Sequence, residues 1–350
     1  MADHEHWQLD GRTPELYQRH PAITSIATDF NDRAIHRTRQ AALQGTTERS
    51  QKQMAPVPPS LVVTGTSSGI GYAVAGLAIA QGWRVFGSVR NEADAARLTG
   101  EFGDLLTPLI FDVRDEAALA VAAKTVHASL GSATLNGLVN NAGIGLGGPV
   151  LHQPLDEFRA VLDTNILGTL LATRAFTPLL GADQTLSGRK GRIVNITSIA
   201  GKIGSPFAGA YVASKFAVEG LSEVMRRELK LYGIDVVVVA PATVDTPIWD
   251  QPEGAIGRYA ATDYGRAFDK GVRTIVRAGH RHGLQAKDVA KTVMKALTAR
   301  RPRLRYAPAQ HALMEKALPR LAPKRVTDFV IAHSLGLMPD EKKALRGVSV

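Results

Sequence analysis

From Leu61 onward, the sequence alternates short apolar segments with longer amphipathic ones. The short segments are apolar at consecutive positions, which is typical of strands in a parallel sheet covered on both faces. The amphipathic segments between them are long enough to be crossover helices, and such crossovers are right-handed. The pattern therefore predicts an α/β fold, a doubly wound parallel sheet of about seven strands with helices on both faces.

The expected elements follow one another in a regular order. Strands are expected at residues 61–64, 84–89, 105–111, 135–140, 192–197, 234–240 and 303–306. Helices are expected at residues 70–81, 92–98, 115–130, 156–180, 208–232 and 287–299. The alternation stops at residues 244–285, which we expect to form an insertion over a substrate site.

The two ends of the chain differ from this alternating region. Residues 1–59 show no sustained apolar periodicity and end in the proline-rich run Ala55 to Pro59, which is typical of a stiff linker. We expect a poorly ordered segment and linker there, one catalytic domain at residues 60–310, and a C-terminal helical extension at residues 311–350. Met54 lies just before the linker and is an alternative translation start to Met1.

Composition excludes several classes of protein. The chain has no cysteine, which excludes disulfides, thiolate metal sites and cysteine nucleophiles. No uninterrupted apolar run reaches the roughly 18 residues of a membrane-spanning helix, and the N-terminus lacks the basic start and apolar core of a signal peptide. We therefore expect a cytoplasmic protein, and we expect no metal site.

The net charge of +10 is concentrated in one stretch. Residues 258–305 contain 13 Lys or Arg residues against 3 Asp or Glu residues, so the rest of the chain is balanced. A local basic stretch is typical either of a solvated face or of a surface for an anionic partner or membrane, and both interpretations stay open. The stretch carries no recognised nucleic-acid motif, so a nucleic-acid partner is not expected.

A glycine-rich loop joins the first expected strand to the first expected helix. Gly65 permits a tight turn, Gly69 lets the backbone approach a pyrophosphate, and Gly71 allows close helix packing. Amides at the start of the helix then stabilise the anion. Because the loop lies between a strand and a helix, it predicts a dinucleotide site in a Rossmann-type fold.

The end of the next strand indicates which dinucleotide binds. An NAD-preferring site places an acidic residue there for the ribose hydroxyls. This strand ends Ser88-Val89-Arg90, and the planar donor group of Arg90 suits a 2′-phosphate. We expect NADP, with NAD as the alternative.

Tyr211 and Lys215 are four residues apart on an expected helix, so both side chains lie on one face. Reduction of a ketone builds negative charge on oxygen and requires a proton donor there. A neighbouring lysine cation stabilises a tyrosine phenolate and lowers its pKa, which is near ~10 when free. Ser198 ends the fifth strand and is expected to hydrogen-bond the substrate oxygen. Asn165, inside the preceding helix, is expected to hold a water that links Lys215 to solvent.

Together these residues resemble the short-chain dehydrogenase/reductase family, in its compact single-domain branch. The similarity spans about residues 60–306 and rests on the loop Thr64–Gly71, Asp112, the run Asn140–Gly143, Asn165, Ser198, Tyr211 with Lys215, and Pro241 with Thr246. The family usually has Pro-Gly where this chain has Pro241-Ala242, which leaves the geometry of that loop open. The resemblance implies catalytic roles for Asn165, Ser198, Tyr211 and Lys215.

The resemblance also implies a set of cofactor contacts. Asp112 would flank the adenine, while Val244 and Thr246 would hold the nicotinamide end. The whole set is Gly65, Ser67, Ser68, Gly69, Ile70, Gly71, Arg90, Asp112, Val113, Asn140, Ala142, Gly143, Tyr211, Lys215, Pro241, Val244 and Thr246.

Residues 144–150, 199–207 and 244–285 are the expected walls of the substrate pocket, and they are rich in apolar and aromatic side chains. With the similarity of residues 215–221 to hydroxysteroid and retinol dehydrogenases, they indicate a lipophilic secondary alcohol or ketone as the substrate. Two alternatives stay open, a 3-oxoacyl thioester reductase and a non-catalytic regulator that senses NADP. The resemblance implies a homodimer or homotetramer. The tail segments 311–321 and 326–337 either pack on protein or bind a membrane surface.

Overall fold

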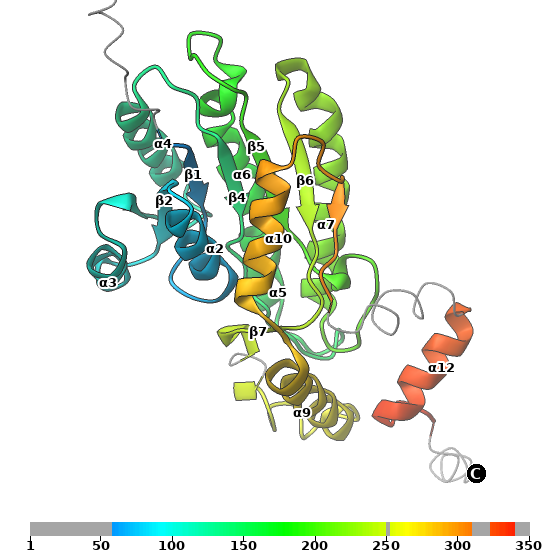
Figure 1. Cartoon of the computed structure of the whole chain (residues 1–350). Helices are drawn as coiled ribbons and strands as arrows, with labels where there is room; N and C mark the ends of the chain where they lie inside the picture. The colour runs from blue at the N-terminus through cyan, green and yellow to red at the C-terminus, as the bar shows by residue number, and fades with distance from the viewer. Residues whose placement is uncertain (1–57, 250–252, 310–322, 340–350) are drawn as a thin grey trace, which may run out of the picture. The chain divides into compact units, whose positions relative to one another are not determined.

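The computed structural model describes residues 58–249, 253–309 and 323–339. Their centre is a seven-stranded parallel sheet in the order β3-β2-β1-β4-β5-β6-β9 (Figure 1). The strands are β1 (Ser60–Val63), β2 (Arg84–Val89), β3 (Leu106–Ile110), β4 (Gly137–Asn140), β5 (Arg192–Ile196), β6 (Asp235–Val239) and β9 (Arg305–Tyr306). The predicted fold class is confirmed. The strand order reverses between β1 and β4, and ligands of such sheets bind beyond the carboxyl ends of the strands at that point.

Helices cover both faces of the sheet. One face carries α2 (Gly69–Ala80), α3 (Glu92–Phe102) and α10 (Ala286–Thr298), and the other carries α4 (Glu116–Leu130), α6 (Gly168–Phe176) and α7 (Gly209–Glu228). Val62 and Val63 are neighbours in β1 and both fully buried, yet each belongs to a different core cluster. Successive strand residues point to opposite faces, so a strand between two helical layers must be apolar throughout. This explains the apolar runs in the sequence.

The helix expected at residues 156–180 is less regular than its sequence pattern indicates. It begins as α5 (Leu155–Leu162), passes through a π-helical turn at Asp163–Leu167, continues as α6 and ends in a second π-helical turn at Pro178–Ala182. Such turns insert a residue into the helical repeat and often occur at functional sites. The first of them carries Asn165.

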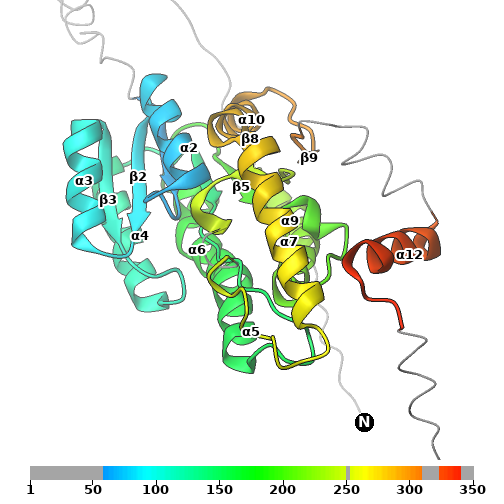
Figure 2. The same cartoon turned by 90° about the horizontal axis from the view of Figure 1, so that it is seen from below.

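The insertion at residues 244–285 contains a long helix that the sequence interpretation did not assign. Two short parallel strands, β7 (Val244–Asp245) and β8 (Leu284–Gln285), pair at its base. Between them runs α9 (Gly265–His282), whose inner face buries Phe268, Val272 and Val276. Figure 2 shows α9 crossing the end of the domain.

Within the C-terminal extension, the structure describes α12 (Lys324–Leu335), which contacts α9. A Cβ built on Gly271 of α9 would lie 3.6 Å from a methyl of Leu335. The expected amphipathic segment at residues 311–321 lies outside the described residues. Of the helices described, none combines the length and apolarity that crossing a membrane requires.

Candidate active site

The glycine-rich loop forms a tight backbone cradle between β1 and α2. Gly65 and Gly69 have φ angles of +72° and +59°, a region that favours glycine. A Cβ on Gly71 would overlap the carbonyl oxygen of Gly65, so only glycine fits there. Ser68 precedes α2 but makes no capping hydrogen bond through its side chain, and the first turn carries no acidic residue. The first amides of α2 are therefore available to a phosphate, and the cradle fits a dinucleotide pyrophosphate.

A second loop, after β4, fastens the cradle. Asn141 Nδ2 donates hydrogen bonds to the carbonyls of Thr64 and Gly65, each at 2.9 Å. The Thr64 hydroxyl in turn accepts from the amides of Asn141 and Ala142 at 2.9 and 3.0 Å. The two loops thus hold each other in place. The sequence analysis did not assign a role to Asn141, although its place in the Asn-Asn-Ala-Gly run was the available signal.

At the adenosine end of the cradle the structure brings several charged groups to one edge of the sheet. Arg90 is exposed at the end of β2. Asp112 accepts from Arg114 at 2.7 Å, and this hydrogen bond, with a smaller effect of the Arg90 charge, holds the pKa of Asp112 below its usual value. Arg97 of α3, which the sequence analysis did not single out, donates to the carbonyl of Ser67 at 2.7 Å. Arg114 is paired with Asp112 and Arg97 with Asp94, so among the described residues Arg90 is the cation of this edge that an anionic ribose phosphate could pair with.

Ser198, Tyr211 and Lys215 converge at the carboxyl end of β5. The Ser198 hydroxyl lies near the Tyr211 hydroxyl and acts to lower the pKa of Tyr211. The Lys215 ammonium lies 5.5 Å from the centre of the Tyr211 ring and donates to the Ile196 carbonyl at 3.1 Å. The four-residue spacing on α7 thus places both side chains on one face, as predicted.

Burial governs the protonation of this group. It raises the pKa of Tyr211, and the Ser198 hydroxyl lowers it by less. Desolvation lowers the pKa of Lys215, which is only 7% exposed, to about 8. The sequence led us to expect that the lysine cation lowers the pKa of Tyr211. Burial acts in the opposite direction, because it removes both groups from water and disfavours their charged forms. In this state the phenol is protonated, which is the form that can donate a proton to a ketone oxygen.

The Asn165 side chain has all of its hydrogen-bonding atoms in use. Its Oδ1 accepts from the Ile144 amide at 2.9 Å, and its Nδ2 donates to the Ile144 carbonyl at 3.0 Å and to Ser214 Oγ at 2.9 Å. Ser214 lies between Tyr211 and Lys215 on α7. Asn165 therefore links the loop after β4 to the helix that carries the tyrosine. Its expected role in holding a water stays a prediction.

A buried carboxylate beneath the site was not anticipated. Glu219, one turn beyond Lys215, accepts from the hydroxyl of Thr197 at 2.8 Å. Arg305 of β9 donates to both of its carboxylate oxygens at 3.0 Å. Thr197 directly precedes Ser198, so Glu219 fixes the backbone next to the serine. The sequence signal was weak, because Glu219 and Arg305 are 86 residues apart.

The side chains of the remaining predicted cofactor contacts do not all face the cradle. Pro241, Val244 and Thr246 follow β6, and the Thr246 methyl approaches the cradle at Gly69. Asn140 points into the interior instead, where its Nδ2 donates to Thr173 and Asn195 at 2.9 Å. Ser67, Ser68 and Ile70 belong to the loop and start of α2, Asp112 and Val113 follow β3, and Ala142 and Gly143 follow β4, with Val113 buried in the core. Their contacts with a cofactor stay a prediction.

An aromatic cluster covers the substrate side of the site. Phe207 has a φ of +66°, unusual for a residue other than glycine, and its carbonyl accepts from the Gly148 amide at 2.8 Å. Its ring lies 5.6 Å from that of Phe268 on α9, which in turn lies 4.8 Å from the ring of Tyr259. The loop after β4, the loop after β5 and α9 thus meet in one apolar wall, and its role as the wall of a substrate pocket stays a prediction. Such a wall favours an apolar ligand.

Buried polar atoms without a partner gather in this wall. Both side-chain polar atoms of Gln153 (6% exposed) and the Tyr259 hydroxyl (5% exposed) make no hydrogen bond among the described residues. The Tyr259 hydroxyl lies so close to Gly148 that a Cβ there would overlap it, and Gln153 Cβ is beside it. One Glu157 oxygen is also unpaired, while the other accepts from Arg258 at 2.6 Å. Buried polar groups normally find a partner, so this cluster can bind water or a polar group of a ligand.

Comparison with known proteins gives consistent results over most of the chain. A family profile described as short chain dehydrogenase matches residues 60–254. An NADPH-dependent 3-dehydrocapnine reductase of Ornithobacterium rhinotracheale is 36% identical over 283 residues, covering 80% of this chain and 98% of the relative. Retinol dehydrogenase 5 of Mus musculus is 31% identical over 304 residues, covering 81% and 91%. A crystal structure of a short-chain dehydrogenase/reductase from Burkholderia phymatum with NAD superposes with a TM-score of 0.64 at 26% identity, covering 77% and 94%.

Proposed function

Because the chain belongs to the short-chain dehydrogenase family and is an NAD(P)-dependent oxidoreductase acting on CH–OH groups, we propose that it interconverts a lipophilic secondary alcohol and its ketone with NADP(H). The observation that carries this proposal is the convergence of Ser198, Tyr211 and Lys215 beside a phosphate cradle. A protein that only sensed the cofactor would not need all three side chains.

In the proposed reaction each side chain has one task. NADPH, when bound, supplies the hydride. Ser198 hydrogen-bonds the ketone oxygen and orients it, and Tyr211 donates its proton to that oxygen as negative charge develops. The Lys215 cation, 5.5 Å from the ring, stabilises the phenolate that remains. Asn165 keeps α7 and the loop after β4 in register and would bind the water that returns a proton.

Arg90 is the proposed determinant of cofactor choice. It is exposed at the end of β2, where its guanidinium can form two parallel hydrogen bonds with a 2′-phosphate. The similar reductase from Ornithobacterium rhinotracheale is described as NADPH-dependent, which supports the same preference here. NAD remains the alternative cofactor.

The substrate class follows from the wall around the site. Phe207, Tyr259 and Phe268 present aromatic surface, and retinol dehydrogenase 5 among the relatives is named for a lipophilic alcohol. The second candidate is a 3-oxoacyl thioester, which the basic outer face of α9 would attract. We also propose that α5 and α7 pair subunits into a homodimer or homotetramer, because α7 exposes Phe216 and Val224.

A cofactor titration tests the proposal. NADPH and NADH binding is followed by cofactor fluorescence for the wild type, Arg90→Ala and the control Arg300→Ala. We expect NADPH to bind at least tenfold more tightly, the preference to disappear in Arg90→Ala, and Arg300→Ala to behave as the wild type. Turnover is then measured with lipophilic ketones and with 3-oxoacyl thioesters. Absence of binding by either cofactor would reject the function, whereas equal binding would reject only the role of Arg90.

A further inference from the structure

The outer face of α9 carries a continuous stripe of cations. Arg266, Lys270, Arg273, Arg277 and Arg281 recur every three or four residues, and all five are exposed. The only acidic residue in the helix is Asp269, whose carboxylate accepts from the Gly257 amide instead. None of the five cations forms an ion pair with another residue in the described part of the chain. As far as the described residues show, the stripe therefore presents its charge to solvent.

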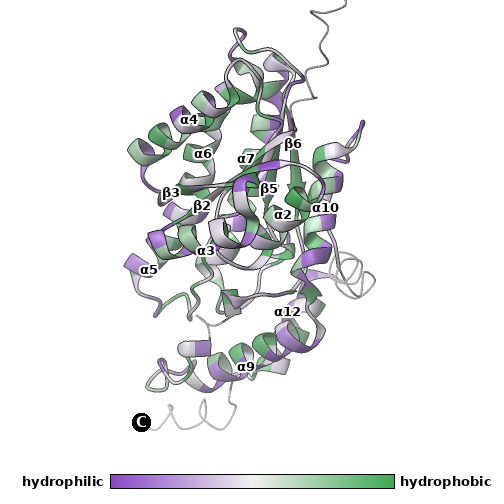
Figure 3. Cartoon of the chain, turned by 60° about the vertical axis from the view of Figure 1, so that its left-hand side comes forward, coloured by the Kyte–Doolittle hydropathy of each residue, from purple (hydrophilic) through white to green (hydrophobic). Residues whose placement is uncertain are grey.

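The arrangement of α9 separates two chemical environments. Phe268, Val272 and Val276 on the inner face are buried in the substrate wall, while the cations lie on the outer face. Figure 3 shows hydrophobic and hydrophilic residues interleaved along this helix, as two faces require. A partner bound to the outer face of α9 would thus lie one helix diameter, about 10 Å, from the substrate wall.

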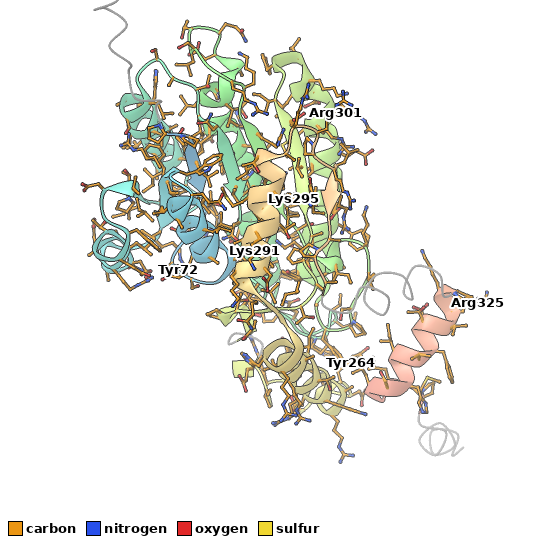
Figure 4. The ribbon with its side chains drawn as sticks, in the orientation of Figure 1. Tyr72, Tyr264, Lys291, Lys295, Arg301 and Arg325 are labelled. Carbon is orange, nitrogen blue, oxygen red and sulfur yellow. The ribbon has the colours of Figure 1, made fainter. Side chains whose placement is uncertain are left out.

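Beside α9, α12 exposes an apolar face. Val326, Phe329 and Val330 are 52%, 57% and 56% exposed and lie at i, i+3 and i+4 of the helix. Lys324 and Arg325 add two exposed cations at its start, and Arg325 is labelled in Figure 4. Leu335 packs toward α9, so the helix is anchored while its apolar face has no partner among the described residues.

We propose that α9 and α12 together form a docking surface for an anionic lipid membrane. Basic side chains beside apolar ones are the combination that interfacial helices use, since the cations meet lipid phosphates while the apolar side chains enter the acyl boundary. A second copy of the chain is a poorer fit. Two identical stripes of five cations would repel each other across a symmetric contact.

The surface gives a physical reason for the basic stretch in the sequence. A lipophilic substrate partitions into the bilayer, so an enzyme that binds an anionic membrane next to its substrate wall meets the substrate at a high local concentration. This last consequence rests on the proposed function, whereas the membrane binding itself does not.

Vesicle sedimentation of the full chain tests the docking surface. The vesicles are phosphatidylcholine alone and phosphatidylcholine mixed with an equal part of phosphatidylglycerol. The charge variant is Lys270→Gln, Arg273→Gln and Arg277→Gln combined. Its matched control replaces Arg300, Arg301 and Arg303 with Gln, which removes three exposed charges elsewhere. Figure 4 shows Arg301 at one end of the molecule and Tyr264, the residue before α9, at the other end.

The apolar contribution is tested by Phe329→Ser with Val330→Ser. The matched control is Val121→Ser with Leu231→Ser, which changes two exposed apolar residues on other elements. Melting temperatures of all variants are recorded, so that a folding defect is recognised before binding is compared.

We expect wild-type protein to sediment with anionic vesicles and not with neutral ones, and binding to weaken as salt shortens the Debye length. The charge variant should lose about a hundredfold in partition coefficient, since each cation near an anionic surface is worth about fivefold. The α12 variant should lose about tenfold or more, and both controls should bind as wild type. Equal binding by the charge variant and its control would overturn the proposal. So would a dimer in sedimentation velocity that the α12 variant abolishes without any change in vesicle binding, because α12 would then pack on a second copy.

Discussion

The two sides of the active site are built differently. On the cofactor side, hydrogen bonds among Thr64, Gly65 and Asn141 hold the cradle. Position 71 must be glycine, because a side chain there would overlap the Gly65 carbonyl. On the substrate side, Gln153 and Tyr259 bury polar atoms without partners, and Phe207 has an unfavourable φ. Asn140 Oδ1 is the one buried orphan atom described near the cradle.

The difference follows from what each side must bind. The same dinucleotide binds in every reaction cycle, so a rigid backbone cradle suits it. Backbone strain and unpaired buried polar groups, in contrast, are common at sites that bind a ligand. The cofactor side therefore has the more complete hydrogen bonding, and the unpaired atoms of the proposed substrate side can bind a ligand. Four substitutions test this comparison, taken in order of expected effect.

Tyr211→Phe tests the point where the two sides meet. We expect kcat for ketone reduction to fall by about a thousandfold, because the ring remains while the proton donor is lost. NADPH affinity should fall far less than turnover, because the cradle is untouched and only the expected contact of the Tyr211 hydroxyl is lost. Steady-state kinetics and a fluorescence titration measure both, with Tyr232→Phe as the control. A fall in activity of less than about tenfold would assign the proton transfer to another group.

Gly71→Ala tests the rigidity of the cofactor side. The added methyl group overlaps the Gly65 carbonyl, so we expect the free energy of unfolding to fall by about 3 kcal/mol and NADPH binding to be lost. Gly100→Ala on α3 is the matched control. Nothing lies within 4 Å of its Cβ position, so it should stabilise the helix by about 0.5–1 kcal/mol. Denaturant unfolding measures both; a Gly71 variant as stable as wild type would show that the cradle relaxes.

Lys215 should make stability depend on pH. Its pKa is about 8 in the folded protein and 10.5 when unfolded. Between these values the unfolded chain binds more protons than the folded one, so stability rises with pH across this window, by up to about 3 kcal/mol. Denaturant melts at pH 7 and pH 10 should show this rise for wild type and not for Lys215→Met. A rise of the same size in both proteins would contradict the assignment.

Tyr259→Phe tests the substrate side, and the smallest effect is expected there. Removing a buried hydroxyl that has no partner should leave stability unchanged or raise it by about 1 kcal/mol. Tyr306→Phe is the contrasting variant. The Tyr306 hydroxyl accepts from the Arg303 amide at 3.1 Å, so its loss should cost about 1 kcal/mol. If Tyr259→Phe destabilises the protein as Tyr306→Phe does, the hydroxyl is already satisfied in the ligand-free protein and the contrast between the two sides fails.

The comparison also explains what could be predicted from the sequence. The cradle and the Tyr211–Lys215 pair are local, since a few residues and the helical repeat determine them. Arg97 reaches Ser67 from another helix, and Arg305 reaches Glu219 from the last strand, so neither contact has a sequence signature. The helix α9 was missed because residues 244–285 were interpreted as an interruption of the strand–helix alternation, although Phe268, Val272 and Val276 recur at helical spacing. The role of Asn165 depends on a π-helical turn that periodicity does not show.

The Glu219–Arg305 ion pair has a consequence for how the enzyme matures during translation. A growing chain contains Ser198, Tyr211 and Lys215 long before residue 305 leaves the ribosome, but until then the Glu219 carboxylate has no guanidinium opposite it. Only the half-exposed Lys202, at 3.8 Å, and the Thr197 hydroxyl then face the buried carboxylate, so the backbone at Thr197 is held less firmly in that interval. At about 5–20 residues per second, the site remains incomplete for several seconds after its last catalytic residue has been added. Nascent chains would therefore be spared premature turnover until the sheet receives its final strand.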